Sequence, residues 1–135
     1  MSGLRPPPPQ RLDIELGSFG VDGFHLEYRD GQLRYGRGGG YYREYETVAP
    51  PSEPQLLAFR NALEALDVWH WQRSYDNIAV LDGTQWEVTI NWGRKRVSSH
   101  GSNAYPRQFG AFLDAVRALI HPHPFYDLNS FNEAP

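Results

Sequence analysis

The sequence contains no cysteine, which excludes disulfide bonds, thiolate nucleophiles and cysteine-based zinc sites. A reducing cytoplasm is the compartment that this composition favours. Apolar runs are also short. No stretch resembles a signal-peptide core, and nowhere do about eighteen apolar residues follow one another. We therefore expect neither secretion nor a membrane-spanning segment.

A net positive charge is absent as well, because the formal charge is −3 at pH 7. The chain as a whole does not attract a polyanion, which counts against nucleic acid as the default partner. Methionine is scarce while Trp and Tyr are frequent, so aromatic rings are expected to supply much of the core. The length of 135 residues is typical of one domain that folds without a metal, and we expect no cofactor.

The N-terminal segment is rich in proline, with Pro6 to Pro9 in succession. Prolines lack the backbone N–H and cannot join a helix interior, so a mobile segment of polyproline II character is expected. Its alternative use is as a ligand for a proline-binding domain. We predict a disordered tail over residues 1–11, one folded domain over 12–128 and a frayed end over 129–135.

Strict alternation of apolar and polar residues predicts strands over 12–16, 24–28 and 33–35, with Asp30-Gly31 forming the turn of a hairpin. A second hairpin is expected from 78–81 and 86–92 around Asp82-Gly83. Two more strands are expected at 41–48 and 95–100, the last ended by residues 101–103.

Two segments have the periodicity of amphipathic helices. Ser52 and Gln55 form a capping-box signature for a helix over 53–66, and Pro106 is expected to open the second helix. The buried stripe of the second helix is predicted to contain Phe109, Phe112, Leu113, Val116 and Leu119.

These elements predict an α+β fold with two layers, in which a twisted antiparallel sheet of about six or seven strands carries both helices on one face. The two helix stripes match at one constant offset, and the two Asp-Gly turns recur close to it, which suggests an internal duplication. The alternative is that any two units of strands and a helix share such turns and caps.

The loop between the last strand and the second helix is the first candidate site. Ser99, His100, Ser102, Asn103 and Arg107 surround a helix N-terminus, where backbone N–H groups and the helix dipole favour an anion. The alternative is a glycine turn that caps the helix. Because neither a phosphate-binding glycine loop nor a G-x-S-x-G turn is present, no catalytic residue is assigned.

Aromatic residues supply the second candidate site. Trp86 and Trp92 share a strand face and are expected in the core, whereas other aromatic residues suit an interaction surface. The latter are Tyr41, Tyr42, Trp69 and Trp71. The Arg-Gly-Tyr composition of residues 35–43 also resembles a stacking platform for single-stranded nucleic acid, although a flexible hairpin loop is favoured.

His121 and His123 alternate with prolines and precede Asp127, a composition found in some metal sites. Without fixed supporting residues a surface turn is favoured, and no metal ligand is assigned.

Three spaced motifs lie in the second half of the chain: W-x-x-x-Y from Trp71, D-G-x-x-W from Asp82 and S-x-G-S-N-x-x-P from Ser99. Together they resemble a pattern found in a family of small bacterial proteins without an assigned activity. The resemblance implies a bacterial cytoplasmic origin.

The leading hypothesis from the sequence is a non-catalytic module that binds another protein through the open sheet face and the aromatic segments. The alternative is a small protein or enzyme that binds an anion or phosphate ligand at residues 98–107.

Overall fold

The structure is a computed structural model that describes residues 7–17, 23–39, 42–43, 46–76, 85–102 and 104–123. Its elements are β1 Arg11–Gly17, β2 Gly23–Arg29, β3 Gln32–Gly39, β4 Tyr42–Arg43, β5 Glu46–Val48, α1 Glu53–Ala65, the 3-10 helix η1 Val68–His70, β6 Ser74–Asp76, β7 Gln85–Trp92, β8 Lys95–Ser102 and α2 Phe109–Ile120.

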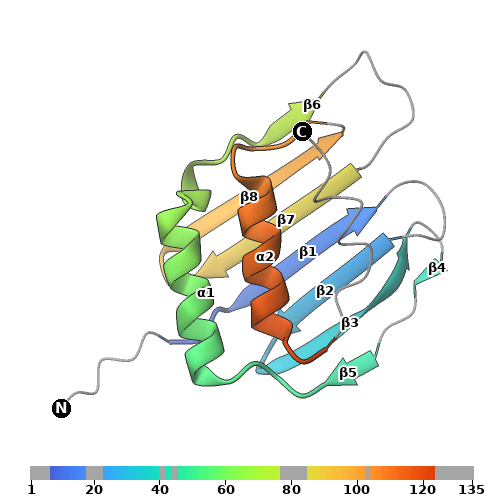
Figure 1. The fold of residues 1–135 in the computed structure, drawn as a ribbon, viewed down its shortest axis with the longest axis vertical. Helices are drawn as coiled ribbons and strands as arrows, with labels where there is room; N and C mark the ends of the chain where they lie inside the picture. Colours follow the sequence, from blue (N-terminus) through green and yellow to red (C-terminus); the bar gives the residue numbers. More distant parts are fainter. Residues whose placement is uncertain are drawn as a thin grey trace.

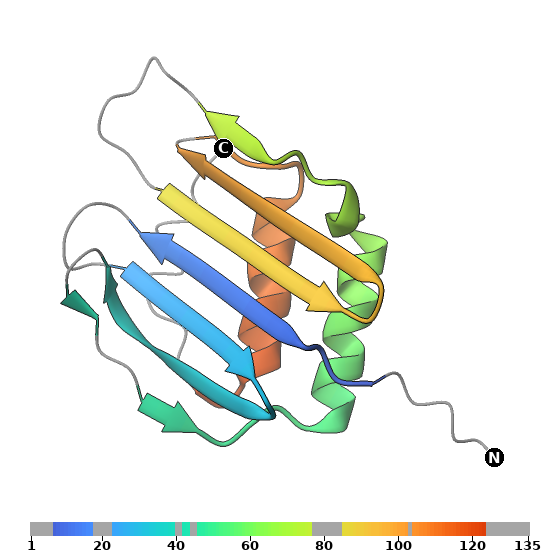
Figure 2. The same ribbon diagram turned by 180° about the vertical axis from the view of Figure 1, so that it is seen from behind.

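The fold has two layers, a twisted sheet and a pair of helices that lie side by side on one of its faces (Figure 1). The strand order is β4-β3-β2-β1-β7-β8-β6, and β5 also pairs with β3. Figure 2 shows the opposite face, which neither helix covers. The predicted α+β architecture is confirmed, and we call the uncovered side the open face.

Strand β1 lies in the middle of the sheet and pairs antiparallel with β2 on one edge and with β7 on the other. Leu12, Ile14 and Leu16 point toward the helices and are buried. The predicted hairpin of β2 and β3 is confirmed, and both Asp30 (φ 54°) and Gly31 (φ 75°) adopt the left-handed conformation that its tight turn requires.

The predicted pairing of 78–81 with 86–92 is wrong. Strand β7 has β1 on one edge and β8 on the other, so neither edge is free for a preceding strand. Its hairpin partner is β8, joined through Gly93 at φ 63°. Residues 78–81 and the Asp82-Gly83 turn lie outside the described part of the chain. The strand pairing in the second half of the chain differs from that in the first half, and the internal duplication stays a prediction.

The last strand extends further than predicted, because Gly101 and Ser102 remain within β8. There they pair with β7 on one side and with β6 on the other, and the pairing with β6 is parallel. Pairing on both edges holds this stretch extended despite its glycine, whose conformational freedom had suggested a break.

An aromatic cluster closes this end of the core. The ring of Trp86 lies 4.9 Å from that of Phe109, 5.8 Å from Tyr75 and 6.0 Å from Trp71, centroid to centroid. Its indole Nε1 donates a hydrogen bond to the carbonyl of Ala104 at 2.8 Å. Both Trp86 and Trp92 are buried, so their predicted place in the core is confirmed.

The first helix follows its sequence signals. Ser52 caps it and exchanges hydrogen bonds with Gln55 in the predicted capping box. Gln55 also donates to the carbonyls of Ala118 and His121, which ties the start of α1 to the end of α2. The second helix begins at Phe109, three residues after Pro106, and the five residues predicted for its buried stripe are all buried.

The segment before β1 contacts the domain. Pro9 is buried, and the backbone N–H of Gln10 donates to the carbonyl of Asn91 at 3.0 Å. Arg11, which the sequence assigned to the tail, is the first residue of β1. Among the described residues, no helix is both long and apolar enough to cross a bilayer.

Gly101 provides a test of the packing around Trp86. A Cβ at this position would lie 2.7 Å from the carbonyl oxygen of Ala104 and even closer to Nε1 of Trp86. We expect Gly101→Ala to lower the free energy of unfolding by about 1 to 3 kcal/mol through overpacking. Chemical denaturation followed by Trp fluorescence measures the change.

Gly110→Ala is the matched control, because a Cβ on this α2 residue meets no atom within 4 Å. It should stabilise the protein by up to about 1 kcal/mol through helix propensity. Equal stabilities of the two variants would contradict this account of the Trp86 contact.

Candidate functional site

The most organised group of polar side chains lies on the open face, in the centre of the sheet. Strands β1, β2 and β7 expose alternate residues there, because successive side chains of a strand point to opposite faces. In the observed register Glu15 lies opposite His25 on one side and Glu87 on the other. Asp13 lies opposite Glu27 and Thr89. The register thus gathers charged residues from three strands, and we call this group the His25 cluster.

His25 is the buried centre of the cluster, with only 7% of its surface exposed. Its ring Nδ1 lies 3.0 Å from Oε1 of Glu15, and its Nε2 lies 3.3 Å from Oδ1 of Asp13. Burial alone would lower the pKa of His25, but hydrogen bonds to Asp13 and Glu15 outweigh it and raise the pKa to about 9. At neutral pH the ring is therefore a buried imidazolium held between two carboxylates.

Asp13 is the anion that most of the cations share. Arg11 approaches its Oδ2 at 2.9 Å and Arg29 at 3.2 Å, while His25 faces its other oxygen. Burial by itself would raise the pKa of Asp13, yet the hydrogen bonds from His25 and Arg11 dominate and lower it to about 2. Asp13 stays ionised throughout the physiological range.

Glu27 extends the cluster toward β3. Its carboxylate lies 3.4 Å from Nε of Arg29 and 3.5 Å from Nη1 of Arg34. Both arginines are about half exposed, so these pairs contribute little stability and mainly fix the position of the carboxylate.

The cluster borders a polar pocket of about 180 Å³ that extends from β2 across β1 to β7. Its lining contains Arg11, Asp13, Glu15, His25, Glu87 and Thr89. Within the described residues Glu87 has neither a hydrogen-bond nor an ion-pair partner, in contrast to the other charged groups of this pocket. The pocket therefore offers one uncompensated carboxylate beside a preformed ion-pair network.

Asp13, His25 and Glu27 each place a ligand atom within 4.8 Å of the others, which is the spacing of a metal site. A metal would require a neutral imidazole, whereas the pKa of His25, raised to about 9 by Asp13 and Glu15, keeps its ring protonated. Arginines already neutralise both carboxylates. This arrangement favours an internal ion-pair network over a bound metal at neutral pH.

The structure describes four of the five residues of the loop predicted as an anion site. Ser99 is fully buried on the helix side of β8, and its Oγ donates to the carbonyl of Gln72 at 2.5 Å. His100 and Ser102 follow the alternation of the strand and point to the opposite side. Arg107 is exposed in the turn before α2, and Asn103 lies outside the described residues.

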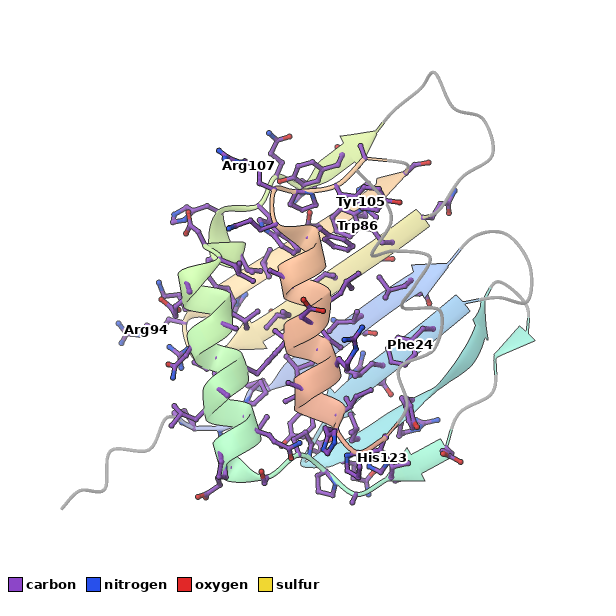
Figure 3. All side chains as sticks on the ribbon, in the orientation of Figure 1. Phe24, Trp86, Arg94, Tyr105, Arg107 and His123 are labelled. Atoms are coloured by element: carbon purple, nitrogen blue, oxygen red, sulfur yellow. The ribbon has the colours of Figure 1, made fainter. Side chains whose placement is uncertain are left out.

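Figure 3 shows the arginines that border this loop in the sequence. Arg94 and Arg107 project away from the domain near different ends of β8, while Trp86 and Tyr105 lie together beneath the start of α2. The two arginines therefore lie apart from each other.

The predicted aromatic surface is described in part. Trp71 is partly buried among the rings of Trp86, Phe109 and Phe112, so most of it belongs to the packed cluster. Trp69 packs against the core and donates its indole N–H to Glu64 at 2.6 Å. Tyr41 and the side chain of Tyr42 lie outside the described part.

The histidines after α2 do not form a group with a third ligand in the described structure. His121 is exposed, and the ring of His123 packs 5.7 Å from that of Tyr35. Asp127 lies outside the described residues.

The sequence showed the members of the His25 cluster as the polar face of strands but not as a site. The missing information is the register, which places residues of β7 beside residues of β1 that lie some seventy positions earlier. The sequence did contain one usable signal, namely a histidine together with acidic residues on one strand face. Charged residues are seldom buried unless they are paired, so such a mixture can indicate an ion-pair network.

No protein-family model matches the sequence, and no curated protein matches it.

The raised pKa of His25 gives a stability test. A group with a raised folded-state pKa stabilises the fold fully below its unfolded pKa of about 6.5 and loses this contribution as pH rises through about 9. We expect the free energy of unfolding to fall across this interval by up to about 3 kcal/mol. Denaturant titrations between pH 6 and 10 measure the change.

His25→Gln should remove most of this pH dependence and be most destabilising near pH 6, where it takes the imidazolium away from Glu15 and Asp13, although Asp13 keeps its two arginines. His100→Gln, on the same face but exposed, is the control and should keep the wild-type profile. A His25→Gln profile parallel to that of the wild type would show that the ring is not charged in the fold.

Proposed function

We propose that the protein is a non-catalytic binding module that docks a basic side chain of a partner protein in the pocket between Glu15 and Glu87. The observation that carries the proposal is the carboxylate of Glu87, which lines the polar pocket on the open face and has no partner among the described residues. A lysine or arginine from a partner would complete the network there.

The charge balance of the pocket supports a cationic ligand. Three carboxylates line it, from Asp13, Glu15 and Glu87, against two cations, from Arg11 and His25. Asp13 and Glu15 are already engaged by these cations, so the excess negative charge lies at Glu87. A guanidinium or ammonium group is the complementary ligand, and an anion would meet repulsion.

The titration properties support binding rather than acid–base catalysis. A general acid or base works best with a pKa near the working pH. The network of Asp13, His25 and Glu15 moves two pKa values away from neutrality, that of Asp13 to about 2 and that of His25 to about 9. Neither side chain is suited to exchange a proton with a substrate near pH 7.

The place of the pocket supports a macromolecular partner. The pocket lies on β1 and β7 in the middle of the sheet, and no described helix covers this side (Figure 2). A paired strand on each side makes it a rigid platform, so little ordering entropy is lost on binding.

The cysteine-free composition and the resemblance to small bacterial proteins support a bacterial cytoplasm as the compartment.

A peptide with two arginines, acetyl-Gly-Arg-Gly-Arg-Gly-amide, tests the proposal. We expect its addition to shift the backbone amide signals of Glu87 and Thr89 in a heteronuclear NMR titration at low salt. Glu87→Gln should weaken binding two- to five-fold, the effect of an exposed ion pair worth up to about 1 kcal/mol. Raising the salt concentration should weaken binding as well.

Glu46→Gln is the matched control, because it removes the same charge from β5, four strands away from β7. Binding to this variant should equal that of the wild type. The proposal fails when the peptide shifts map to another surface, or when Glu87→Gln binds the peptide as tightly as the wild type does.

A further inference from the structure

An apolar groove lies on the helix side of the sheet, at the end where α1 begins. It has a volume of about 450 Å³ and is lined by Pro7, Pro8, Tyr28, Glu53, Pro54, Leu56, Leu57 and Trp92. Leu57 is 45% exposed and is the one exposed large hydrophobic residue of the described chain. With the exposed prolines beside it, this residue forms an apolar patch of the kind that marks interaction sites.

The chain already places a proline segment of its own against one wall of this groove. The indole Nε1 of Trp92 donates a hydrogen bond to the carbonyl of Pro7 at 2.8 Å. The side chain of Gln10 accepts a hydrogen bond from the backbone N–H of Gly93 at 2.8 Å, which anchors the segment where it enters β1. We call Pro7 and Pro8 the proline strap.

We propose that the groove binds a proline-rich segment of a partner protein, which takes the place of the proline strap. The strap shows which chemistry the groove accepts, namely a tertiary-amide carbonyl on an indole N–H and proline rings against aromatic and aliphatic walls. Proline-binding domains use aromatic grooves of this kind to bind polyproline II segments. The inference is independent of the open face, since Trp92 points to the helix side, where its ring lies 6.3 Å from that of Phe59 in α1.

The polar groups of the groove favour proline over other occupants. The polar side chains of the lining are Trp92, Tyr28 and Glu53, and the other lining residues are prolines and leucines, which offer no side-chain hydrogen bond. The indole N–H of Trp92 is a donor that already holds a proline carbonyl. A suitable ligand therefore supplies carbonyl acceptors and brings few N–H groups that need partners. A proline-rich segment meets both conditions and loses little entropy on binding, because it is extended before it binds.

The strap is held lightly enough to be displaced. Pro7 and Pro8 are both exposed. Within the described structure, the hydrogen bond from Trp92 to Pro7 is the only one that either proline makes. Pro9 is buried and Gln10 is bonded to the sheet, so opening can stop at Pro8 without disturbing β1. Local opening of this kind costs far less than global unfolding.

An acetylated and amidated octaproline peptide tests the proposal on the full-length chain. In a titration followed by the indole N–H signals, the signal of Trp92 should shift, and that of Trp86, bonded to Ala104, should not. A glycine-serine peptide of equal length should leave both signals unchanged. Leu57→Asp should weaken octaproline binding at least about ten-fold, because it puts a carboxylate on the apolar wall.

Two variants complete the design. Asn61→Asp adds the same charge to an exposed residue one turn further along α1 and should bind octaproline like the wild type. The double variant Pro7→Gly, Pro8→Gly loosens the strap and should bind roughly three-fold more tightly or better, because a competing internal ligand lowers the apparent affinity.

Absence of a Trp92 shift at millimolar octaproline would overturn the proposal, as would equal binding by Leu57→Asp and Asn61→Asp. Unchanged affinity in the double glycine variant would overturn displacement of the strap. Concentration-dependent dimerisation that octaproline does not reverse would assign the groove to a second copy of the chain, against the proposal. None of these outcomes affects the open-face pocket, whose test uses Glu87.

Discussion

The pairing of β1 with β2 on one edge and β7 on the other is the constraint on which the rest of this structure depends. It joins the first half of the chain to the second, and it does so through seven paired residues on each side. A slip of one residue would turn Leu12, Ile14 and Leu16 outward, so burial of these side chains fixes the register. The same register then decides which charged residues meet on the open face.

The His25 cluster follows from that register, and its energetics are those of a partly buried ion network. Removing a charge from water costs free energy. His25 and Asp13 offset this cost because each forms an ion pair with the other and with at least one further charged residue. Apolar residues of similar size often stabilise a fold at least as much as such a network does. What the network provides is a defined charge pattern, because the imidazolium and the carboxylates are held at fixed positions on the open face.

Local features of this fold could be predicted from the sequence, whereas features that depend on distant pairing could not. The capping box at Ser52, the stripe of α2 and the turn at Asp30-Gly31 depend on residues within a few positions, and all were predicted correctly. The pairing of β7 with β1 was missed, because the rule that neighbouring strands form hairpins favoured 78–81 on that edge, while β1 fills it from far away in the sequence.

Strand β1 also connects the two surfaces to which we assign binding. The proline strap leads into it through Pro9 and Gln10. Gln10 bonds to Asn91 of β7 and to Gly93 in the turn after β7, immediately before Arg11 reaches Asp13. These anchors separate the strap, which Trp92 holds through a carbonyl, from the ion network that begins one residue later. Opening the strap as far as Pro8 therefore leaves every ion pair in place, whereas release of Gln10 would free the first residue of β1. The position of Gln10 thus makes the two surfaces independent, and only a ligand that pulls beyond Pro8 would couple them.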